Sequence, residues 1–312
     1  MSIKQKTLSL ILPVYFNEGT LSELFKQLER TERELSKHDT LLELIFIDDG
    51  SEDNSLKKLL NYRKIRPTTK IIKLTRNFGA VAATKTGFKF VTGDCFAIIA
   101  ADLQDPIEKV LEMFLEWKDG HKFVLCRRLS RNDPLISTIL SKVYYNIIRF
   151  LVTSDYPSGG FDLMLMDKEI LPFVRDSSKN INTHLYAYWL GFKPKVLEYH
   201  RPERQHGKSR WTFTKKLKLA IDTITGFSVA PIRLISAFGF LIAMASFGFG
   251  IVVIIKSIFG TTTVAGFVTI VTLICFFGGM TLFVLGILGE YIWRIFDNNT
   301  TTPESVIDTT FL

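Results

Sequence analysis

The sequence predicts an α/β fold with a mostly parallel β-sheet and helices on both faces, followed by two membrane-spanning helices near the C-terminal end. Short apolar runs alternate with helical patterns over the first part of the 312 residues, an order that is typical of right-handed crossovers between parallel strands. Polar clusters follow these runs, at the strand ends where parallel sheets bind their ligands. Two long apolar stretches, residues 234–255 and 258–288, then contain no charged side chain.

Each strand and helix is placed by the turn residues that bound its apolar pattern. The expected strands are 8–14, 42–47, 71–74, 96–100 and 123–126, and the expected helices are 20–36, 55–63, 80–91, 107–117 and 135–151. The first run is short and no small-residue cleavage site follows it, so we interpret it as a strand and not as a signal peptide. The tail 297–312 is rich in Thr and Asn, and we expect it to be mobile.

The two apolar stretches are each long enough to cross a bilayer, which takes about 20 apolar residues in a helix. One charge near mid-bilayer costs roughly 2.5–3.5 kcal/mol, so its absence favours a span; a pair of buried core helices is the alternative. We place the second span at 267–288 and the turn at 257–266. Basic residues crowd before the first stretch, and Arg294 follows the second. The positive-inside rule therefore predicts a multi-pass protein of the cell inner membrane, with two spans and both termini in the cytoplasm.

The chain accordingly divides into four segments. They are a cytoplasmic domain over 1–211, amphipathic juxtamembrane helices over 212–232, a two-helix transmembrane hairpin over 233–295 and a cytoplasmic tail over 296–312. The second segment has one apolar stripe, formed by Leu217, Ala220, Ile221, Ile224 and Phe227. Such a helix can lie in the membrane interface, and an ordinary amphipathic core helix is the alternative.

The net charge of +8 bears on the partners of the chain. Its basic residues gather beside the apolar stretches, where anionic lipid headgroups lie. The sequence has no RNA-binding motif and no zinc-finger spacing. We therefore expect a membrane surface and phosphate-bearing substrates as partners, and no nucleic acid. Cys95, Cys126 and Cys275 stand far apart, which favours reduced structural thiols.

Paired carboxylates after the second expected strand form the first candidate site. Asp48 and Asp49 precede a turn at Gly50 and Ser51. Carboxylates at such a strand end suit hydrogen bonding to a nucleotide base and ribose. The alternative is a capped turn that only starts the next helix.

Oxygen-bearing side chains after the fourth expected strand form the second candidate site. Asp102 and Gln104 are two residues apart and can hold Mg²⁺ or Mn²⁺ against a diphosphate; a surface turn ahead of a helix is the alternative.

A group of basic residues forms the third candidate site. It suits phosphate, which guanidinium groups bind bidentately. Its members are Arg76, Arg127, Arg128, Arg131, Arg201, Arg204, Lys208 and Arg210.

Several motifs taken together resemble one family. They are Pro13-Val14-Tyr15-Phe16-Asn17-Glu18, Asp48-Asp49-Gly50-Ser51, Thr75-Arg76-Asn77-Phe78-Gly79, Ala101-Asp102-Leu103-Gln104-Asp105-Pro106, Glu203-Arg204-x-x-Gly207-x-Ser209-Arg210-Trp211 and Leu288-Gly289-Glu290-Tyr291-Ile292-x-Arg294. Over nearly its whole length the chain resembles the polyisoprenyl-phosphate glycosyltransferases of glycosyltransferase family 2, such as dolichol-phosphate mannose synthase and the GtrB-type bactoprenol glucosyltransferases. The resemblance implies a GT-A fold and inverting transfer of a sugar from a nucleotide diphosphate to a polyprenyl phosphate.

The resemblance also implies roles for single residues. Nucleotide-sugar binding falls to Pro13, Tyr15, Glu18, Asp48, Asp49, Arg76 and Asp102, metal binding to Asp102 and Gln104, and acceptor phosphate binding to Arg127, Arg131, Arg204, Ser209 and Arg210. Asp102, Asp162 and Arg127 are the expected catalytic residues. The family further implies a UDP-linked hexose, glucose first, undecaprenyl phosphate as acceptor, a role in cell-surface glycan modification such as that of O-antigen, and a homo-oligomer such as a tetramer.

Two positions depart from the family pattern. Ala100 stands where Asp is usual and Met164 where Arg is usual, so one expected metal or diphosphate carboxylate is missing. A catalytically silent homologue that binds nucleotide sugar or lipid is therefore an alternative. A processive polysaccharide synthase is another, although two spans cannot enclose a channel.

The ionisation of the acceptor bears on the role of Asp162. A phosphate monoester with a pKa near 6 is largely a dianion at neutral pH, so it needs no strong general base to attack the sugar. Asp162 is therefore expected to orient the sugar or the acceptor.

Overall fold

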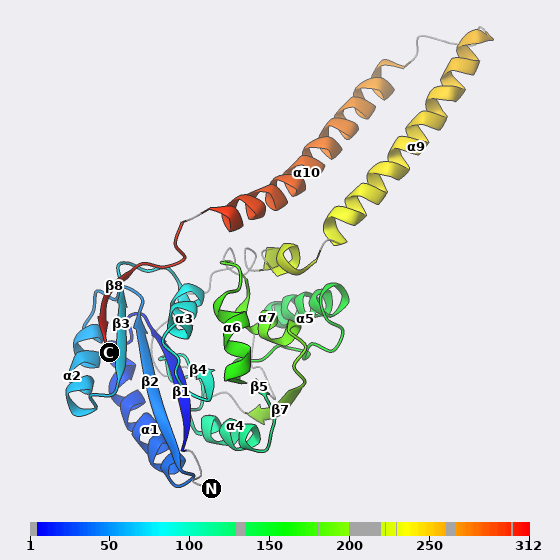
Figure 1. Cartoon of the computed structure of the whole chain (residues 1–312). Coiled ribbons are helices and arrows are strands. Elements are labelled where there is room, and N and C mark those ends of the chain that lie inside the picture. The colour runs from blue at the N-terminus through cyan, green and yellow to red at the C-terminus, as the bar shows by residue number, and fades with distance from the viewer. Residues whose placement is uncertain are drawn as a thin grey trace. The chain divides into compact units, whose positions relative to one another are not determined.

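The computed structural model describes residues 5–128, 135–179, 181–199, 220–221, 223–228, 230–259, 266–300 and 302–312 (Figure 1). The chain forms two compact units. The first consists of Met1–Ala220 together with Thr302–Leu312, and the second of Ile221–Thr301. The last residues of the chain therefore belong to the same unit as the first ones.

An eight-stranded sheet is the centre of the first unit, with the order β7-β5-β6-β4-β1-β2-β3-β8. Its strands are β1 (Lys6–Val14), β2 (Thr40–Asp48), β3 (Lys70–Leu74), β4 (Cys95–Ile98), β5 (Phe123–Arg128), β6 (Leu163–Asp167), β7 (Pro194–Tyr199) and β8 (Ile307–Phe311). The pairs β1–β2, β1–β4, β2–β3 and β5–β7 are parallel, and β6 and β8 run antiparallel to their neighbours. The predicted mostly parallel sheet is confirmed.

Helices alternate with these strands as the apolar pattern predicts. In the first unit they are α1 (Glu18–Ser36), α2 (Ser55–Ile65), α3 (Ala80–Phe88), α4 (Glu108–Lys118), α5 (Leu135–Leu151), α6 (Leu171–Arg175) and α7 (Thr183–Trp189), with a 3₁₀ turn at Lys168–Ile170. All the expected helices and strands up to α5 are present, with bounds that differ by a few residues. The amphipathic juxtamembrane segment expected over 212–232 lies largely outside the described residues.

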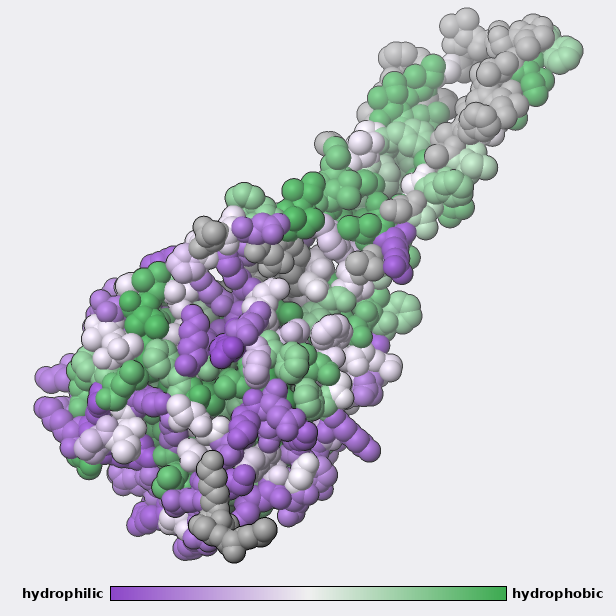
Figure 2. All heavy atoms as spheres, in the orientation of Figure 1, coloured by the Kyte–Doolittle hydropathy of each residue, from purple (hydrophilic) through white to green (hydrophobic). Residues whose placement is uncertain are grey.

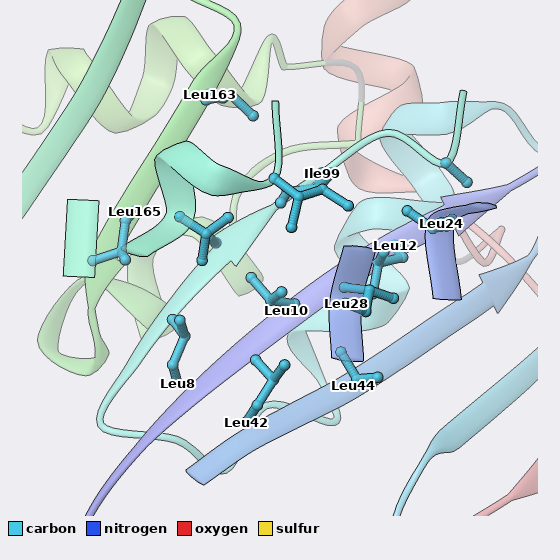
Figure 3. Close-up of a cluster of buried hydrophobic side chains, with 14 of the residues drawn as sticks. Leu8, Leu10, Leu12, Leu24, Leu28, Leu42, Leu44, Ile99, Leu163 and Leu165 are labelled. Atoms are coloured by element: carbon cyan, nitrogen blue, oxygen red, sulfur yellow. The ribbon is translucent and has the colours of Figure 1, made fainter. Parts of the chain in front are cut away.

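The main hydrophobic core lies between the sheet and helices α1 and α4. Leucines of β1 and β2 point toward leucines of α1 in Figure 3, and Leu163 and Leu165 of β6 extend the cluster. Leu8, Leu10 and Leu12 of β1 are fully buried. Alternation along β1 sends Ile11 to the opposite face, where a Cβ on Gly87 of α3 would lie 2.4 Å from the Ile11 Cγ2 atom. Both faces of β1 are therefore covered, as in most parallel sheets.

The structure supports the interpretation of Cys95 and Cys126 as structural thiols. Both are unpaired and fully buried, on β4 and β5. Burial raises the pKa of each thiol, and that of Cys126 reaches about 12. A thiol in this state is a poor nucleophile and a poor metal ligand.

The expectation of a mobile C-terminal tail is wrong. Residues 307–311 form β8, the antiparallel edge strand beside β3 in Figure 1. Lys73 and Asp308 make an ion pair of 2.6 Å across the two strands, and Arg63 donates a hydrogen bond to the Leu312 carbonyl. The tail is ordered by pairing with the open edge of β3, a partner that its own polar composition does not reveal.

The second unit consists mainly of helices α9 (Ala230–Ile258) and α10 (Phe267–Asn299), of 29 and 33 residues. α10 begins where the second span is expected but continues past the predicted end at 288. Among the residues that the structure describes, the stretch Phe276–Asp297 is long and apolar enough to cross a bilayer, and Ala230–Ile242 is a shorter apolar segment. Figure 2 shows hydrophobic residues along the visible face of both helices, among those drawn in colour.

Candidate functional site

Loops that follow the parallel strands meet at the carboxyl edge of the sheet. The β1–α1 and β2–α2 loops are joined there by hydrogen bonds, from the Phe16 amide to Ser51 Oγ at 3.1 Å and from the Asn17 amide to Ser55 Oγ at 2.9 Å. The predicted site residue Glu18 takes part, since its Oε2 atom accepts from the Asn54 amide at 2.8 Å. Glu18 thus fixes the start of α2, a role that the sequence motif does not predict.

Pro13 and Tyr15 lie at the end of β1, on the same edge. Pro13 is opposite Ile47 in the register with β2. The Tyr15 amide donates to Asn17 Oδ1 at 2.8 Å, and the Tyr15 ring meets that of Phe16 edge to face at 4.6 Å. Phe16 has a φ of 54°, a left-handed conformation that few non-glycine residues adopt. The turn therefore holds an aromatic pair beside the Asp48 strand end.

Asp48 is fully buried at the end of β2. Its Oδ1 atom accepts a hydrogen bond from the Ser51 amide at 3.3 Å, whereas its Oδ2 atom has no hydrogen-bond partner in the described part of the chain. Burial raises the pKa of Asp48, and the Ser51 hydrogen bonds oppose this, while the nearby charge of Asp53 adds to it. A buried acceptor without a donor is costly, so this oxygen is available for an N–H group of a ligand.

Asp49 has a different task from its neighbour. Its Oδ1 and Oδ2 atoms accept hydrogen bonds from the amides of Phe78 at 2.7 Å and Gly79 at 2.9 Å. Burial raises the pKa of Asp49, and these two hydrogen bonds lower it in part. Both oxygens thus hold the β3–α3 loop, a role that the sequence does not predict. The expected contact of Asp49 with a ribose or diphosphate stays a prediction.

The same loop carries the predicted site residue Arg76. Its guanidinium carbon lies 4.4 Å from the centroid of the Phe78 ring, a cation–π contact. Gly50, with a φ of +69°, lets the two loops approach, because a Cβ there would lie 2.6 Å from the Arg76 carbonyl carbon. The structure therefore brings Asp48 and the Arg76 loop together, as the sequence predicts.

Asp102 and Gln104 follow β4 on the same edge and are half-buried. The backbone N–H of Gln104 donates a hydrogen bond to Asp102 Oδ1 at 3.1 Å, and Leu103 between them has a φ of 60°. Thr20 Oγ1 of α1 donates to the Ala101 carbonyl at 2.7 Å, which fixes the loop to the helix. One carboxylate and one amide oxygen fit Mg²⁺ or Mn²⁺, since such ions often complete their shell with water and substrate phosphate.

Asp162 is tied to the end of β5. Arg128 binds both of its carboxylate oxygens, with an Nη2–Oδ1 distance of 2.6 Å, and the Tyr199 hydroxyl donates to Oδ2 at 3.0 Å. His184 Nε2 lies 3.1 Å from the Asp162 carbonyl oxygen. Burial raises the pKa of Tyr199, and the charge of Asp162 adds to the effect. Asp162 is therefore held in one orientation as part of an ion pair.

Arg128, Tyr199 and His184 are neighbours of Asp162. The sequence places Arg128 only in the basic group expected to bind phosphate, and it gives Tyr199 and His184 no role. Arg127 and Arg128 lie on opposite faces of β5, but both faces are buried further along the strand, at Leu125 and at Cys126. Alternation alone therefore does not single out Arg128. Arg127 pairs instead with Glu198 on β7, and both side chains are more than one third exposed. Of the other predicted phosphate ligands, Arg131, Arg204, Ser209 and Arg210 lie outside the described residues.

The chain is similar in sequence to several known proteins. Residues 9–175 match the family described as Glycosyl transferase family 2. The chain is 32% identical to the uncharacterized glycosyltransferase YkcC of Bacillus subtilis (strain 168), over 97% of this chain and 94% of that protein. It is also 32% identical to the bactoprenol glucosyl transferase of Shigella phage SfX, over 96% of this chain and 98% of the relative. A solved mannosyltransferase from Pyrobaculum calidifontis, in complex with GDP-Man and Mn²⁺, is 14% identical, with a TM-score of 0.46 over 93% of this chain and 88% of its own.

Proposed function

The chain belongs to glycosyl transferase family 2 and is a glycosyltransferase, and on this premise we propose that it transfers a hexose from a nucleotide diphosphate to a polyprenyl phosphate. Glucose, UDP and undecaprenyl phosphate are the substrates that we infer first, because bactoprenol glucosyl transferases align with nearly the whole chain. The observation that carries the proposal is the sheet edge where the unsatisfied Oδ2 atom of Asp48 lies with Arg76 and Asp102.

The donor is bound, in this proposal, by the loops after β1, β2 and β3. Asp48 Oδ2 accepts an imino or amino N–H of the base, which fills its missing hydrogen bond. Tyr15 and Pro13 line the base, and Arg76 faces the diphosphate as a bidentate donor. Asp49 contributes by holding the loop on which Arg76 lies.

Asp102 and Gln104 are the residues that would hold Mg²⁺ or Mn²⁺. Such an ion offsets negative charge on the departing diphosphate. Charged groups fixed beside the departing diphosphate raise the rate, because they stabilise the negative charge that develops there during the reaction. The rest of the proposed chemistry depends on positioning the two substrates.

The transfer itself is a single displacement. A phosphate oxygen of the lipid forms a bond to the anomeric carbon, the bond to the diphosphate oxygen breaks, and the nucleotide leaves with the electron pair. Because the phosphate is already largely ionised at neutral pH, no proton has to be removed from it. Asp162, fixed by Arg128 and Tyr199, is therefore assigned to orient the sugar or the acceptor, and Arg127 to bind a phosphate after exchanging its exposed partner Glu198.

Pairing of β8 with β3 supports the proposal of two membrane spans. The chain leaves the first unit near residue 220 and returns to it at residue 302. A segment that starts and ends in one folded unit crosses a bilayer an even number of times, so the return of the chain to the sheet favours two crossings over a single one by Phe276–Asp297. At about 1.5 Å per residue, α9 and α10 both exceed the roughly 30 Å core of a bilayer. We propose that both helices span the inner membrane and that the sheet and both termini lie in the cytoplasm.

The second span also bears on the proposed homo-oligomer. In the described part of the chain, nothing other than the adjacent backbone of the helix itself lies within 4 Å of the position that a Cβ would take at Gly278, Gly279, Gly286 or Gly289 of α10. Small residues of this kind let membrane helices of two copies approach closely. The number of copies in the purified protein is measured by light scattering in detergent.

The proposed reaction is tested with purified full-length protein, undecaprenyl phosphate and a panel of labelled UDP- and GDP-sugars, with Mg²⁺ or Mn²⁺. Labelled lipid is expected from at least one donor, and UDP-glucose is the first to try. Nucleotide binding is measured in parallel by calorimetry. Binding without lipid product from any donor would favour the alternative of a silent homologue, and the transferase proposal would then be wrong.

Replacing Ala100 with Asp tests how the departure from the family pattern affects metal binding. Ala100 follows β4 and lies two residues before Asp102, so a carboxylate there adds a possible ligand on the same edge. We expect activity to stay unchanged or to rise, with a lower Mg²⁺ concentration at half-maximal rate. A loss of activity would show that Ala100 has another function, such as packing against the donor.

Replacing Asp48 with Asn tests the base contact. A neutral amide is a weaker acceptor than a carboxylate, so we expect roughly tenfold weaker nucleotide binding by calorimetry. The folded-state pKa of Asp48 is raised, so its contribution to stability is fully present below the unfolded pKa of about 4 and is lost as the pH rises through the folded pKa. The Tm of the variant relative to wild type should therefore rise between pH 4 and pH 7. An unchanged nucleotide affinity would remove Asp48 from the donor site.

A further inference from the structure

We propose that the C-terminal tail, residues 302–312, is a positioning element of the donor site and that Glu304 is its key residue. This inference rests on the proposed function for the identity of the ligand. The tail acts on the loop 75–79, which connects β3 to α3 and carries Arg76. Three sets of contacts support it, and all lie within the first unit.

The first contact is made directly to the loop. The Thr75 amide donates a hydrogen bond of 3.0 Å to the Val306 carbonyl, immediately before Arg76. The β3–β8 register is irregular between Lys73 and Leu74, so the tail follows β3 through a bulge up to the start of the loop. The backbone at the entry to the loop is therefore held by a hydrogen bond to the tail.

The second contact fixes the helix at the other end of the loop. Lys85 of α3 is only 3% exposed, and its Nζ atom lies 2.8 Å from Glu304 Oε1. It also donates to the carbonyls of Ser177 at 2.6 Å and Ser178 at 3.1 Å. A buried ammonium group is strongly destabilising without a counter-charge, and Glu304 is the carboxylate that supplies it here.

The third contact extends this attachment by one residue. Thr86 Oγ1 and Ser305 Oγ are 2.5 Å apart. Lys85 and Thr86 are therefore bound by consecutive residues of the tail, at a sequence separation of 219. Such a contact holds α3 against the sheet edge at one defined position.

Together these contacts fix the position of the loop 75–79 at both of its ends. Asp49 holds its last residues through the amides of Phe78 and Gly79, the tail holds its first residue, and Glu304 holds the helix that follows. Arg76 lies between the fixed points. A shift of α3 or of the β3 end would therefore move the guanidinium group that faces the diphosphate, and small displacements at such a site weaken binding.

The test replaces Glu304 with Gln, which keeps the shape of the side chain and removes its charge. We expect about tenfold weaker binding of UDP by calorimetry, with a similar rise in the KM for the sugar nucleotide. The KM for the lipid should change less than twofold. Hydrogen exchange at the amides of residues 75–79 should become faster, a readout that needs no ligand.

A matched control lies at the other end of β3. Glu43 and Lys70 form a partly buried ion pair of 2.6 Å, remote from the loop. Glu43 also accepts hydrogen bonds from Ser9 and Thr92, so Glu43→Gln removes a partly buried charge that is held at least as well as that of Glu304. This variant should have a lower Tm but unchanged UDP affinity and unchanged exchange at 75–79. If Glu304→Gln does not fold, Ser305→Ala, which removes only the hydroxyl contact with Thr86, gives the same comparison in a milder form.

The outcomes separate the two proposals. If wild-type protein binds no nucleotide, the proposed function fails, and hydrogen exchange still decides whether the tail orders the loop. Unchanged exchange at 75–79 in Glu304→Gln would overturn the inference, as would an equal effect of Glu43→Gln on exchange and UDP affinity, because the effect would then be one of general stability.

Discussion

Replacing Asp102 with Asn is expected to lower kcat by roughly 10²–10³-fold, the range seen when a group that stabilises transition-state charge is removed. Asp102 is the carboxylate that follows β4 on the ligand-binding edge, and Ala100 leaves it without the second carboxylate usual in the family. The loss should be accompanied by a higher Mg²⁺ or Mn²⁺ concentration at half-maximal rate. Both quantities are measured by initial rates of labelled lipid formation over a metal titration.

Asp94 provides the control for this variant. It precedes the same strand at the opposite edge of the sheet, where its Oδ2 atom accepts from the Thr7 amide at 3.1 Å. Lys6 and Lys168 lie within 3.7 Å and 3.3 Å of its Oδ1 atom. Asp94→Asn should lower the Tm and leave kcat and metal dependence unchanged. If Asp102→Asn also kept the wild-type metal dependence, Asp102 would not be a metal ligand.

Replacing Asp162 with Asn is the second substitution with a large expected effect, about 100-fold on kcat/KM for the lipid acceptor. The amide loses its charge, so Arg128 no longer has a carboxylate to bind and the network with Tyr199 loosens. Breaking such a partly buried pair leaves one charge without compensation. A fall in Tm should therefore accompany the loss of activity.

Arg128→Lys separates orientation from charge. Lys keeps the positive charge but cannot bind both carboxylate oxygens, so we expect a roughly tenfold loss and an unchanged pH profile. The double variant, with both Asp162→Asn and Arg128→Lys, should lose less kcat/KM for the lipid than the product of the two single losses, because the two residues act as one pair. A pH limb that disappears in Asp162→Asn would contradict the orienting role and make Asp162 a general base.

Much of the first half of the fold can be predicted from the sequence, because its strands and helices have strong local patterns. β1 to β5 and α1 to α5 each follow from apolar periodicity and turn residues. β6 and β7 lie in a region where the helical pattern is broken by glycines, and no periodicity marks them. β8 depends on pairing with a strand more than 200 residues away, and its Asp308, Thr309 and Thr310 give no apolar signal.

The candidate site shows the same division. Composition and strand ends predict Asp48, Arg76 and Asp102 at one edge, and the structure places them there. Sequence cannot tell which of two adjacent carboxylates keeps a free oxygen, since Asp48 and Asp49 differ only in the backbone amides that reach them. Strand alternation puts Arg127 and Arg128 on opposite faces of β5, but which of them meets Asp162 depends on how β6 and β7 pair with β5, which the sequence pattern does not give.

The antiparallel edge strand β8 has a consequence for biosynthesis. Translation proceeds from the N-terminus, so β3 is made early and its outer edge stays open until β8 leaves the ribosome. Both long apolar helices have been synthesised by then. An open strand edge is a template for aggregation, and a chain whose final residues were left on the wrong side of the bilayer would keep that edge exposed. In the proposed topology with two spans, pairing of β8 with β3 would therefore report that the hairpin has inserted correctly.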